Sequence, residues 1–114
     1  MLNQSTSLDL AFQALADPAR RAMLERLSQG PASVSELAKP LQMSMPAVLQ
    51  HLAVLEQAGL ASSRKTGRVR SCELNAARLE DVQNWLNARR AEWEARFDRL
   101  AAYLNTLDEG NKNG

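Results

Sequence analysis

Two serine-capped segments on either side of a tight turn constrain the fold of this chain more than any other feature. Ser33 and Glu36 form the S-x-x-E pattern of a capping box, which opens a short helix that must stop before Pro40. Ser44 then precedes apolar residues at helical spacing, and Gly59 stands where a left-handed residue ends a helix. Two short helices joined by such a turn predict a helix-turn-helix.

The chain on either side of this unit adds helices and one hairpin. Apolar spacing predicts a helix over 8–15, and Asp17-Pro18 predicts the start of a second helix that Gly30-Pro31 ends. After the helix-turn-helix, two segments of alternating character flank Thr66-Gly67, which predicts a β-hairpin over residues 62–74. The expected fold class is therefore mainly α with a small β-hairpin.

A last helix, capped by Asn75 and continuing to about Leu107, carries apolar residues in a heptad pattern. The members of this row are Leu79, Leu86, Trp93, Phe97, Leu100, Leu104 and Leu107. Gln83 and Arg90 interrupt it, so we do not expect a long coiled coil. The row still predicts packing against a second copy, because it is too apolar to stay in water. We expect one domain over residues 1–109 and a disordered tail over 110–114.

Composition and charge narrow the classes of function. The chain has no run of roughly 18 apolar residues and no secretory signal at its start, so we expect a cytoplasmic protein with no membrane partner. Cys72, the only cysteine of the sequence, excludes an internal disulfide. The net charge is only +1, but cations gather in the predicted hairpin at Arg64, Lys65, Arg68 and Arg70.

The helix that follows Ser44 has two distinct faces. A helical wheel directs Met45, Val48, Leu52 and Leu55 toward the core and turns outward Pro46, Ala47, Gln50, Ala53, Val54 and Gln57. The outward face is small and lacks acidic residues, which suits a major groove about 12 Å wide. Gln50 is the best candidate to pair with adenine, and Ser44 with the free N–H groups of the helix start suits a phosphate. An ordinary uncharged surface helix remains the alternative at this point.

Four segments, taken in order, resemble one known family. They are ALADPARR at 14–21, SMPAVLQHL at 44–52, LEQAGL at 55–60 and KTGR at 65–68. These segments are similar to the opening, recognition helix, helix end and wing tip of arsenic-repressor-type (ArsR) winged-helix regulators. The resemblance extends from residue 11 to about residue 107, nearly the whole chain.

Membership of that family implies a winged helix-turn-helix repressor that binds double-stranded operator DNA. It also implies a homodimer held by the first and last helices, which would cover an inverted repeat. The residues expected to contact DNA are Ser44, Pro46, Ala47, Gln50, His51, Arg64, Lys65, Arg68 and Arg70. The residues expected at the dimer interface are Leu8, Phe12, Trp93, Phe97, Leu100, Leu104 and Leu107.

Two departures from the family pattern bear on function. Metal-sensing members carry a Cys-x-Cys-Asp-Leu box, whereas the matching residues here are Ser33-Val34-Ser35-Glu36-Leu37, and the last helix has no histidine. Hydroxyls bind soft metals poorly, so we expect no metal and no cofactor; an unidentified small-molecule effector stays open. Leu49 and Gln50 stand where many relatives have Ser and Lys or Arg, so we expect a different operator sequence.

Single residues of reactive type have plainer interpretations. His51, the only histidine, is expected to be structural or close to DNA, because a lone histidine makes no metal site within one chain. Cys72 is expected to be a half-buried packing residue, since a reactive thiol needs exposure and cationic neighbours. Trp85 and Trp93 are expected in the dimer core more than around a ligand pocket.

Two other classes of function compete with a regulator. A winged-helix module that binds protein and has lost DNA binding would fit the low net charge and Leu49 in the reading helix. An enzyme needs a positioned acid–base or nucleophile set in a pocket, and no such set emerges from the sequence. We therefore expect a protein without catalytic residues.

Overall fold

The computed structural model describes residues 4–112 of the chain. Its contacts group into two compact units, one ending at Val82 and the other beginning at Gln83. The sequence predicted a single domain over residues 1–109. Each unit is described by itself below.

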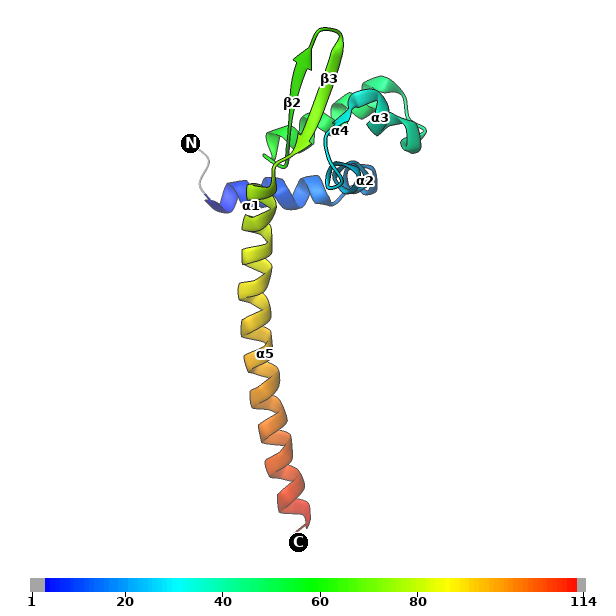
Figure 1. Cartoon of the computed structure of the whole chain (residues 1–114). Coiled ribbons are helices and arrows are strands. Elements are labelled where there is room, and N and C mark those ends of the chain that lie inside the picture. The colour runs from blue at the N-terminus through cyan, green and yellow to red at the C-terminus, as the bar shows by residue number, and fades with distance from the viewer. Residues whose placement is uncertain (1–3, 113–114) are drawn as a thin grey trace. The chain divides into compact units, whose positions relative to one another are not determined.

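The first unit is mostly helical and holds a three-stranded sheet (Figure 1). In chain order its elements are α1 (Gln4–Leu15), α2 (Pro18–Leu27), β1 (Ala32–Ser33), α3 (Val34–Ala38), the 3₁₀ turn η1 (Lys39–Leu41), α4 (Met45–Gln57), β2 (Ala61–Thr66), β3 (Val69–Leu74) and the start of α5 (Ala76–Lys112). This order confirms the predicted mainly α fold with a hairpin. Two boundaries differ: α1 begins at Gln4 instead of Leu8, and α2 ends at Leu27, before Gly30.

Each of the predicted cap residues before α2, α3 and α4 accepts a backbone hydrogen bond, which confirms these helix starts. The Asp17 carboxylate accepts from the N–H of Arg20 at 3.1 Å, and Ser33 Oγ accepts from the N–H of Glu36 at 3.1 Å. Ser44 Oγ accepts from the N–H of Ala47 at 3.3 Å. Each cap supplies a partner for a donor that the first turn of a helix otherwise leaves unpaired.

Gly59 closes α4 in the predicted left-handed conformation, with φ of +76°. A Cβ built at this position would lie 2.9 Å from the side-chain Nε of Arg78. The backbone angle favours glycine, whereas the Arg78 guanidinium is the flexible end of a long side chain and can shift. The chain can therefore turn directly from α4 into β2.

The sheet contains one strand that the sequence did not predict. Its order is β1-β3-β2, and both pairings are antiparallel. β1 has two residues, of which Ala32 pairs with Cys72 and Ser33 with Ser71. Two residues show no alternation, so only their distant partner in β3 reveals the strand. This pairing fixes the start of α3 to the middle of β3.

The core of the first unit lies under α4. Val48, Leu52 and Leu55 are fully buried, as the wheel predicted, among Met23, Leu37, Leu60 and Cys72. Met45 differs from the prediction, because 43% of its surface is exposed. A wheel treats a helix as evenly surrounded, whereas Met45 is the first residue of α4 and lines an open hollow beside the hairpin. Only the later turns of that face are core.

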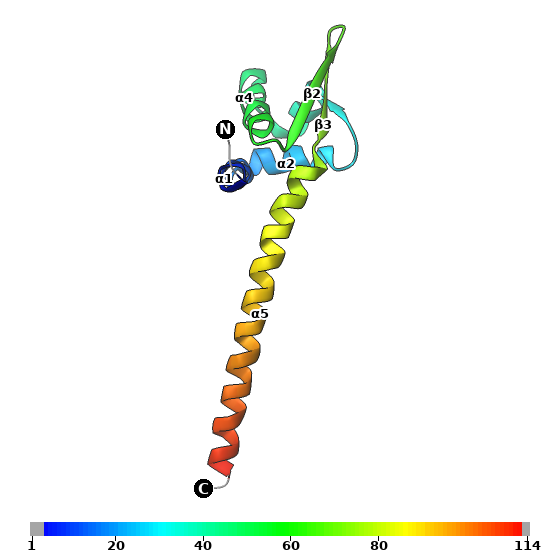
Figure 2. The ribbon, with the colours of Figure 1, turned by 90° about the vertical axis from the view of Figure 1, so that its left-hand side faces the viewer.

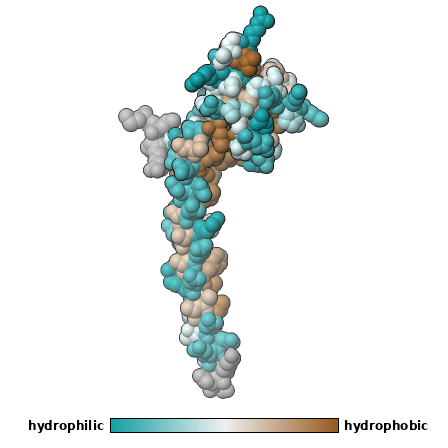
Figure 3. Space-filling model, in the orientation of Figure 1, coloured by the Kyte–Doolittle hydropathy of each residue, from teal (hydrophilic) through white to brown (hydrophobic). Residues whose placement is uncertain are grey.

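The second unit is the part of α5 from Gln83 onward, and most of its apolar side chains are exposed. Figure 3 shows hydrophobic and hydrophilic groups interspersed along this helix. The helix continues through Gly110 to Lys112, so these three residues are helical where the sequence predicted a disordered tail; Asn113 and Gly114 lie outside the described residues. Within residues 4–112, no helix combines the length and apolar character needed to cross a membrane.

Candidate nucleic-acid interface

The outward face of α4 presents small and uncharged side chains to solvent. Ser44, Pro46 and Gln50 are exposed, and Ala47 is half-buried beside them. The only carboxylate of α4 is on Glu56, which lies near the other end of the helix and is bonded to Ser63 and Arg70. The exposed N-terminal half of α4 therefore carries no charge that would repel phosphate.

The hairpin of β2 and β3 turns at Gly67, whose φ is +63°. Figures 1 and 2 both show its closed end as the part of the first unit farthest from α1 and α2. Arg64, Lys65 and Arg68 are exposed, and the described residues include no ion pair for any of them. These cations are free to approach a polyanion.

Arg70 differs from the other hairpin cations. Its Nε donates to Ser63 Oγ at 2.9 Å, and its terminal nitrogen lies 3.2 Å from Glu56 Oε1. The guanidinium therefore ties β3 to β2 and to the end of α4. The sequence placed Arg70 among the cations expected to contact DNA, because it shows the charges of the hairpin but not their proximity to the Glu56 carboxylate.

An open hollow of about 590 Å³ lies between the start of α3, the start of α4 and the hairpin. Lys65 and Arg68 line it together with Met45, Leu49 and Val69. Arg64 belongs to a different hollow, which it lines with Ser62, Thr66 and Glu73 among others. The strands thus divide the predicted wing cations between two faces of the hairpin.

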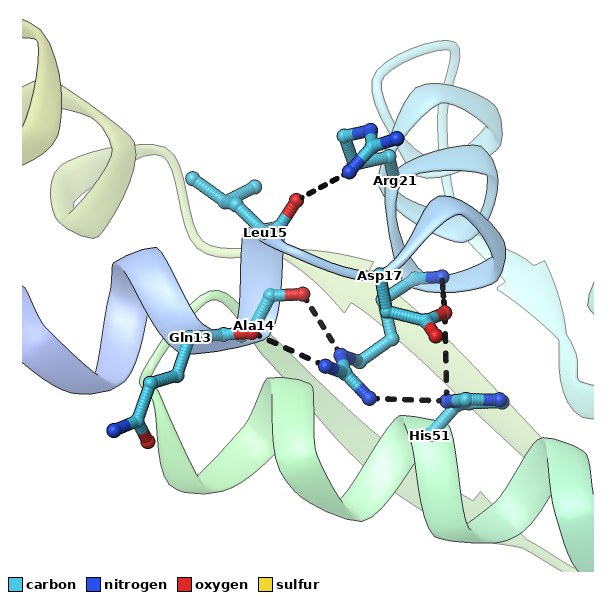
Figure 4. Close-up of polar contacts among 7 residues, drawn as sticks. Gln13, Ala14, Leu15, Asp17, Arg21 and His51 are labelled. Carbon is cyan, nitrogen blue, oxygen red and sulfur yellow. Dashed lines mark hydrogen bonds and ion pairs between the residues drawn. The ribbon is translucent and has the colours of Figure 1, made fainter.

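The side chain of His51 points from α4 toward Asp17 (Figure 4). Its side chain is 17% exposed, and its Nδ1 lies 3.2 Å from a terminal nitrogen of Arg20 and 3.8 Å from Asp17 Oδ2. The Arg20 guanidinium also donates to the carbonyls of Ala14, at 2.8 Å, and Gln13, at 3.1 Å. We call these contacts the Arg20 network.

The Arg20 network joins the end of α1, the start of α2 and the middle of α4. Sequence reasoning listed His51 with the DNA-contacting residues and did not single out Arg20. The sequence contained part of the information about Arg20, because both arginines after Asp17-Pro18 belong to the ALADPARR segment that resembles the family. Their partners, however, are brought together only by the tertiary fold. A structural role for His51 was one of the two roles expected for it.

The chain can now be compared with known proteins. A family model described as bacterial regulatory protein, arsR family, matches residues 17–63. The HTH-type transcriptional regulator Rv2034 of Mycobacterium tuberculosis is 51% identical over 81 residues, which cover 71% of this chain and 76% of that protein. The chain belongs to the ArsR family. It is a DNA-binding transcriptional regulator with a winged helix-turn-helix fold, and its relatives are not enzymes.

Two further comparisons agree with this assignment. The transcriptional repressor SdpR of Bacillus subtilis is 33% identical over 75 residues, which cover 66% of this chain and 83% of SdpR. A crystal structure of the ArsR family transcriptional regulator RHA00566 has a TM-score of 0.76 and 46% identity. That match covers 82% of this chain and 97% of the solved one.

The residues that align with the metal-binding box of the ArsR family have structural partners here. Ser33 Oγ caps α3, and the Glu36 carboxylate lies 3.1 Å from the Arg26 guanidinium. Among the residues that the structure describes, no group of three or more His, Cys, Asp or Glu side chains is placed to hold a metal ion. Ser33 therefore has a local role in folding.

Cys72 is completely buried in β3, more deeply than the half-buried position that we expected. Burial raises the pKa of its thiol, and the nearby Arg70 charge opposes that shift only in part. A buried thiol with a raised pKa is a poor nucleophile. Cys72 acts here as a small apolar residue of the core.

The residues expected at the dimer interface are mostly exposed in the single chain. On α5, the exposed fractions are 56% for Trp93, 68% for Phe97, 51% for Leu100, 53% for Leu104 and 47% for Leu107. On α1, Phe12 is 37% exposed, whereas Leu8 is half-buried and packs against the core. Trp85 is 40% exposed, and the Arg89 guanidinium lies 5.2 Å from its ring centroid.

Asp17 links the Arg20 network to pH. Its pKa is lowered mainly by the hydrogen bond from the backbone N–H of Arg20, with a further contribution from His51. A lowered pKa contributes stability that is fully present above the ordinary value of 3.8 and is lost as the pH falls through the folded value. We expect Asp17→Asn, which keeps a capping oxygen, to melt below the wild type at pH 7, and we expect this difference to shrink as the pH falls below 3.8. Melting curves of both proteins from pH 7 to 3 would check this; a constant difference would contradict it.

Proposed function

We propose that two copies of this chain bind an inverted-repeat operator and repress transcription in the cytoplasm. Each copy lays α4 in a major groove and sets its hairpin against the neighbouring phosphate backbone. One observation carries this proposal: the acid-free start of α4 adjoins Lys65 and Arg68 across one open hollow. A groove-reading helix and a cationic wing are then available on one side of the molecule.

The start of α4 suits the edge of a DNA groove. Its first N–H groups and the helix dipole favour a phosphate beside Ser44, in addition to the cap that Ser44 provides. Gln50, six residues after Ser44, presents an exposed amide that matches adenine N6 and N7. Pro46 and Ala47 are small enough for the helix backbone to approach the base edges.

The second unit supports the two-fold assembly in this proposal. Five apolar side chains of α5, from Trp93 to Leu107, are each about half exposed or more and recur at heptad spacing. Pairing two such helices would remove this row from water. A two-fold dimer then meets two half-sites about 34 Å apart, which is one turn of DNA.

We further propose that release from DNA does not use the metal box of the family. Ser33 and Ser35 offer hydroxyls where thiolates would be needed, and Ser33 is already committed to capping α3. The chain is compatible with release by an organic effector and also with regulation that uses no effector. The operator is therefore the first ligand to identify.

The test of this function is a titration of alanine variants against two duplexes. One is a preferred duplex, selected from random-sequence DNA by its binding to the wild type, and the other is scrambled DNA. Lys65→Ala and Arg68→Ala should each weaken binding to both duplexes and lower the slope of log affinity against log salt by about 0.9 per phosphate contact. Gln50→Ala should instead reduce the preference for the first duplex, by about 1–3 kcal/mol. Fluorescence anisotropy at several salt concentrations measures both effects.

Arg21→Ala is the matched control, because Arg21 is an exposed arginine on α2 that bonds only a carbonyl, that of Leu15. It should leave affinity and salt slope unchanged. If the wing and Gln50 variants behaved like this control, the proposed reading surface would be wrong. If the wild type bound no DNA at low salt, a winged-helix module that binds protein would be the better account.

A further inference from the structure

Apolar side chains are exposed on the flank of α4 that faces the hairpin. Met45 is 43% exposed and Leu49 is 37% exposed, although both belong to the reading helix. They are four residues apart, so they lie one above the other on the same flank. Val69 of β3, which is 56% exposed, lines the same hollow. A monomer gains nothing from leaving these groups in water.

The position of this flank relates it to the DNA. It lies between the outward face of α4, which carries Gln50, and the wing cations Lys65 and Arg68. With α4 in a major groove, Met45 and Leu49 would be held against the base edges on the wing side. Phosphates are poor partners for them, since an apolar side chain would strip water from a charge without replacing it.

The major groove offers one chemical group that suits the apolar side chains of Met45 and Leu49. Base edges there display hydrogen-bond donors and acceptors, and the only apolar group among them is the C5 methyl of thymine. We propose that Met45 and Leu49 recognise thymine methyl groups, so that each half-site carries thymine on the wing side of α4. This inference rests on the proposed function and adds the base class that the apolar flank selects.

The test removes the methyl groups from the DNA and leaves the protein unchanged. A preferred duplex is first selected from random-sequence DNA, and each thymine is then replaced in turn by deoxyuridine, which differs only by the methyl. Burying one such group corresponds to about a fourfold change in affinity. We expect that loss at one or two positions of each half-site and unchanged binding at the others.

Protein variants then assign the effect to the flank. Leu49→Ala and Met45→Ala should bind the thymine and deoxyuridine duplexes equally at the position that each residue contacts. Met43→Ala is the matched control, since Met43 is a similarly exposed methionine, at 38%, that does not line the hollow. It should keep the full sensitivity to deoxyuridine. Melting temperatures of the three variants show whether each is folded.

The outcomes separate this inference from the proposed function. Specific binding with less than a twofold response to every deoxyuridine overturns thymine recognition and leaves the operator function standing. A response that persists in both Leu49→Ala and Met45→Ala also overturns it, because another residue then contacts the methyl. Failure to select any preferred duplex overturns both.

Discussion

Replacing Phe97 and Leu100 together by glutamate is expected to give a folded monomer that has lost tight operator binding. Both side chains are more than half exposed in the single chain, so glutamate meets water there and changes the stability of the monomer little. In a dimer the same positions would bring four carboxylates into an apolar seam. Burying such charges without partners is strongly unfavourable, so the two helices separate.

The loss of the dimer should reduce operator affinity by about 100-fold or more. A two-fold protein binds its second half-site as an intramolecular step, and this avidity typically contributes a factor of 10² to 10⁴. A monomer keeps only the contacts of one α4 and one hairpin. Analytical ultracentrifugation gives the oligomeric state, and titration against one half-site and two half-sites separates avidity from the contacts of one subunit.

The matched control places the same charges on the other side of α5. Ala95 and Ala102 are exposed and lie outside the heptad row, so Ala95→Glu with Ala102→Glu adds two carboxylates without entering the seam. This variant should stay dimeric and bind DNA with at most the modest weakening that added negative charge produces. A dimeric, tightly binding Phe97→Glu, Leu100→Glu protein would show that the seam does not hold the subunits together.

Features whose determinants lie within one turn of chain were predictable from the sequence. Asp17, Ser33 and Ser44 each bond an N–H three residues ahead, so the residue type and its place before an apolar run are enough to locate the helix start. The same holds for Gly67, because a tight hairpin turn favours a positive φ. The helix-turn-helix and the hairpin followed from these local signals.

Features that depend on distant partners could not be predicted in the same way. The strand β1 exists through its pairing with Ser71 and Cys72, and the role of Arg70 depends on Glu56, fourteen positions earlier. The end of α5 shows a different limit. Gly110 disfavours a helix by only about 1 kcal/mol, which is too little to stop one that is already long.

The residues of the candidate site likewise fall into those that local sequence signals predict and those that depend on distant parts of the chain. The outward face of α4 and the cations Lys65 and Arg68 followed from periodicity and charge, since neither needs knowledge of a partner. The apolar flank at Met45 and Leu49 did not, because a wheel assigns Met45 to the core without knowing that no element covers the first turn of α4. The flank was therefore recognised only because Met45 is exposed where the wheel predicted that it would be buried.

Arg20→Ala is expected to cause the second large effect, a loss of about 2 kcal/mol in the free energy of unfolding and weaker DNA binding. Hydrogen bonds that involve a charged group contribute about 1.5–3 kcal/mol when buried, and this guanidinium is only partly buried. Its removal leaves the end of α1 without two donors to the Gln13 and Ala14 carbonyls. A loss of this size lowers the melting temperature by about 10 °C in a domain of this length.

The effect on DNA binding follows from where the Arg20 network ends. His51 comes directly after Gln50 on α4, so releasing His51 from Arg20 loosens the helix that carries the reading side chain. Sequence preference should therefore fall together with affinity, whereas a wing variant lowers affinity alone. Arg20→Lys should recover part of the stability, because an ammonium can donate but cannot span the carbonyls and His51 as the planar guanidinium does.

Arg21→Ala separates this network from a general effect of losing an arginine. Arg21 is the adjacent residue, is exposed, and bonds only the Leu15 carbonyl, so its removal should change stability by about 0.5 kcal/mol or less. Thermal melts at one fixed protein concentration compare the two variants, because dimerisation makes the melting temperature depend on concentration. Equal losses in both variants would mean that α1, α2 and α4 are held together by the apolar core alone. A larger loss for Arg20→Ala would make that residue the polar link between the helix expected at the dimer interface and the helix that reads DNA.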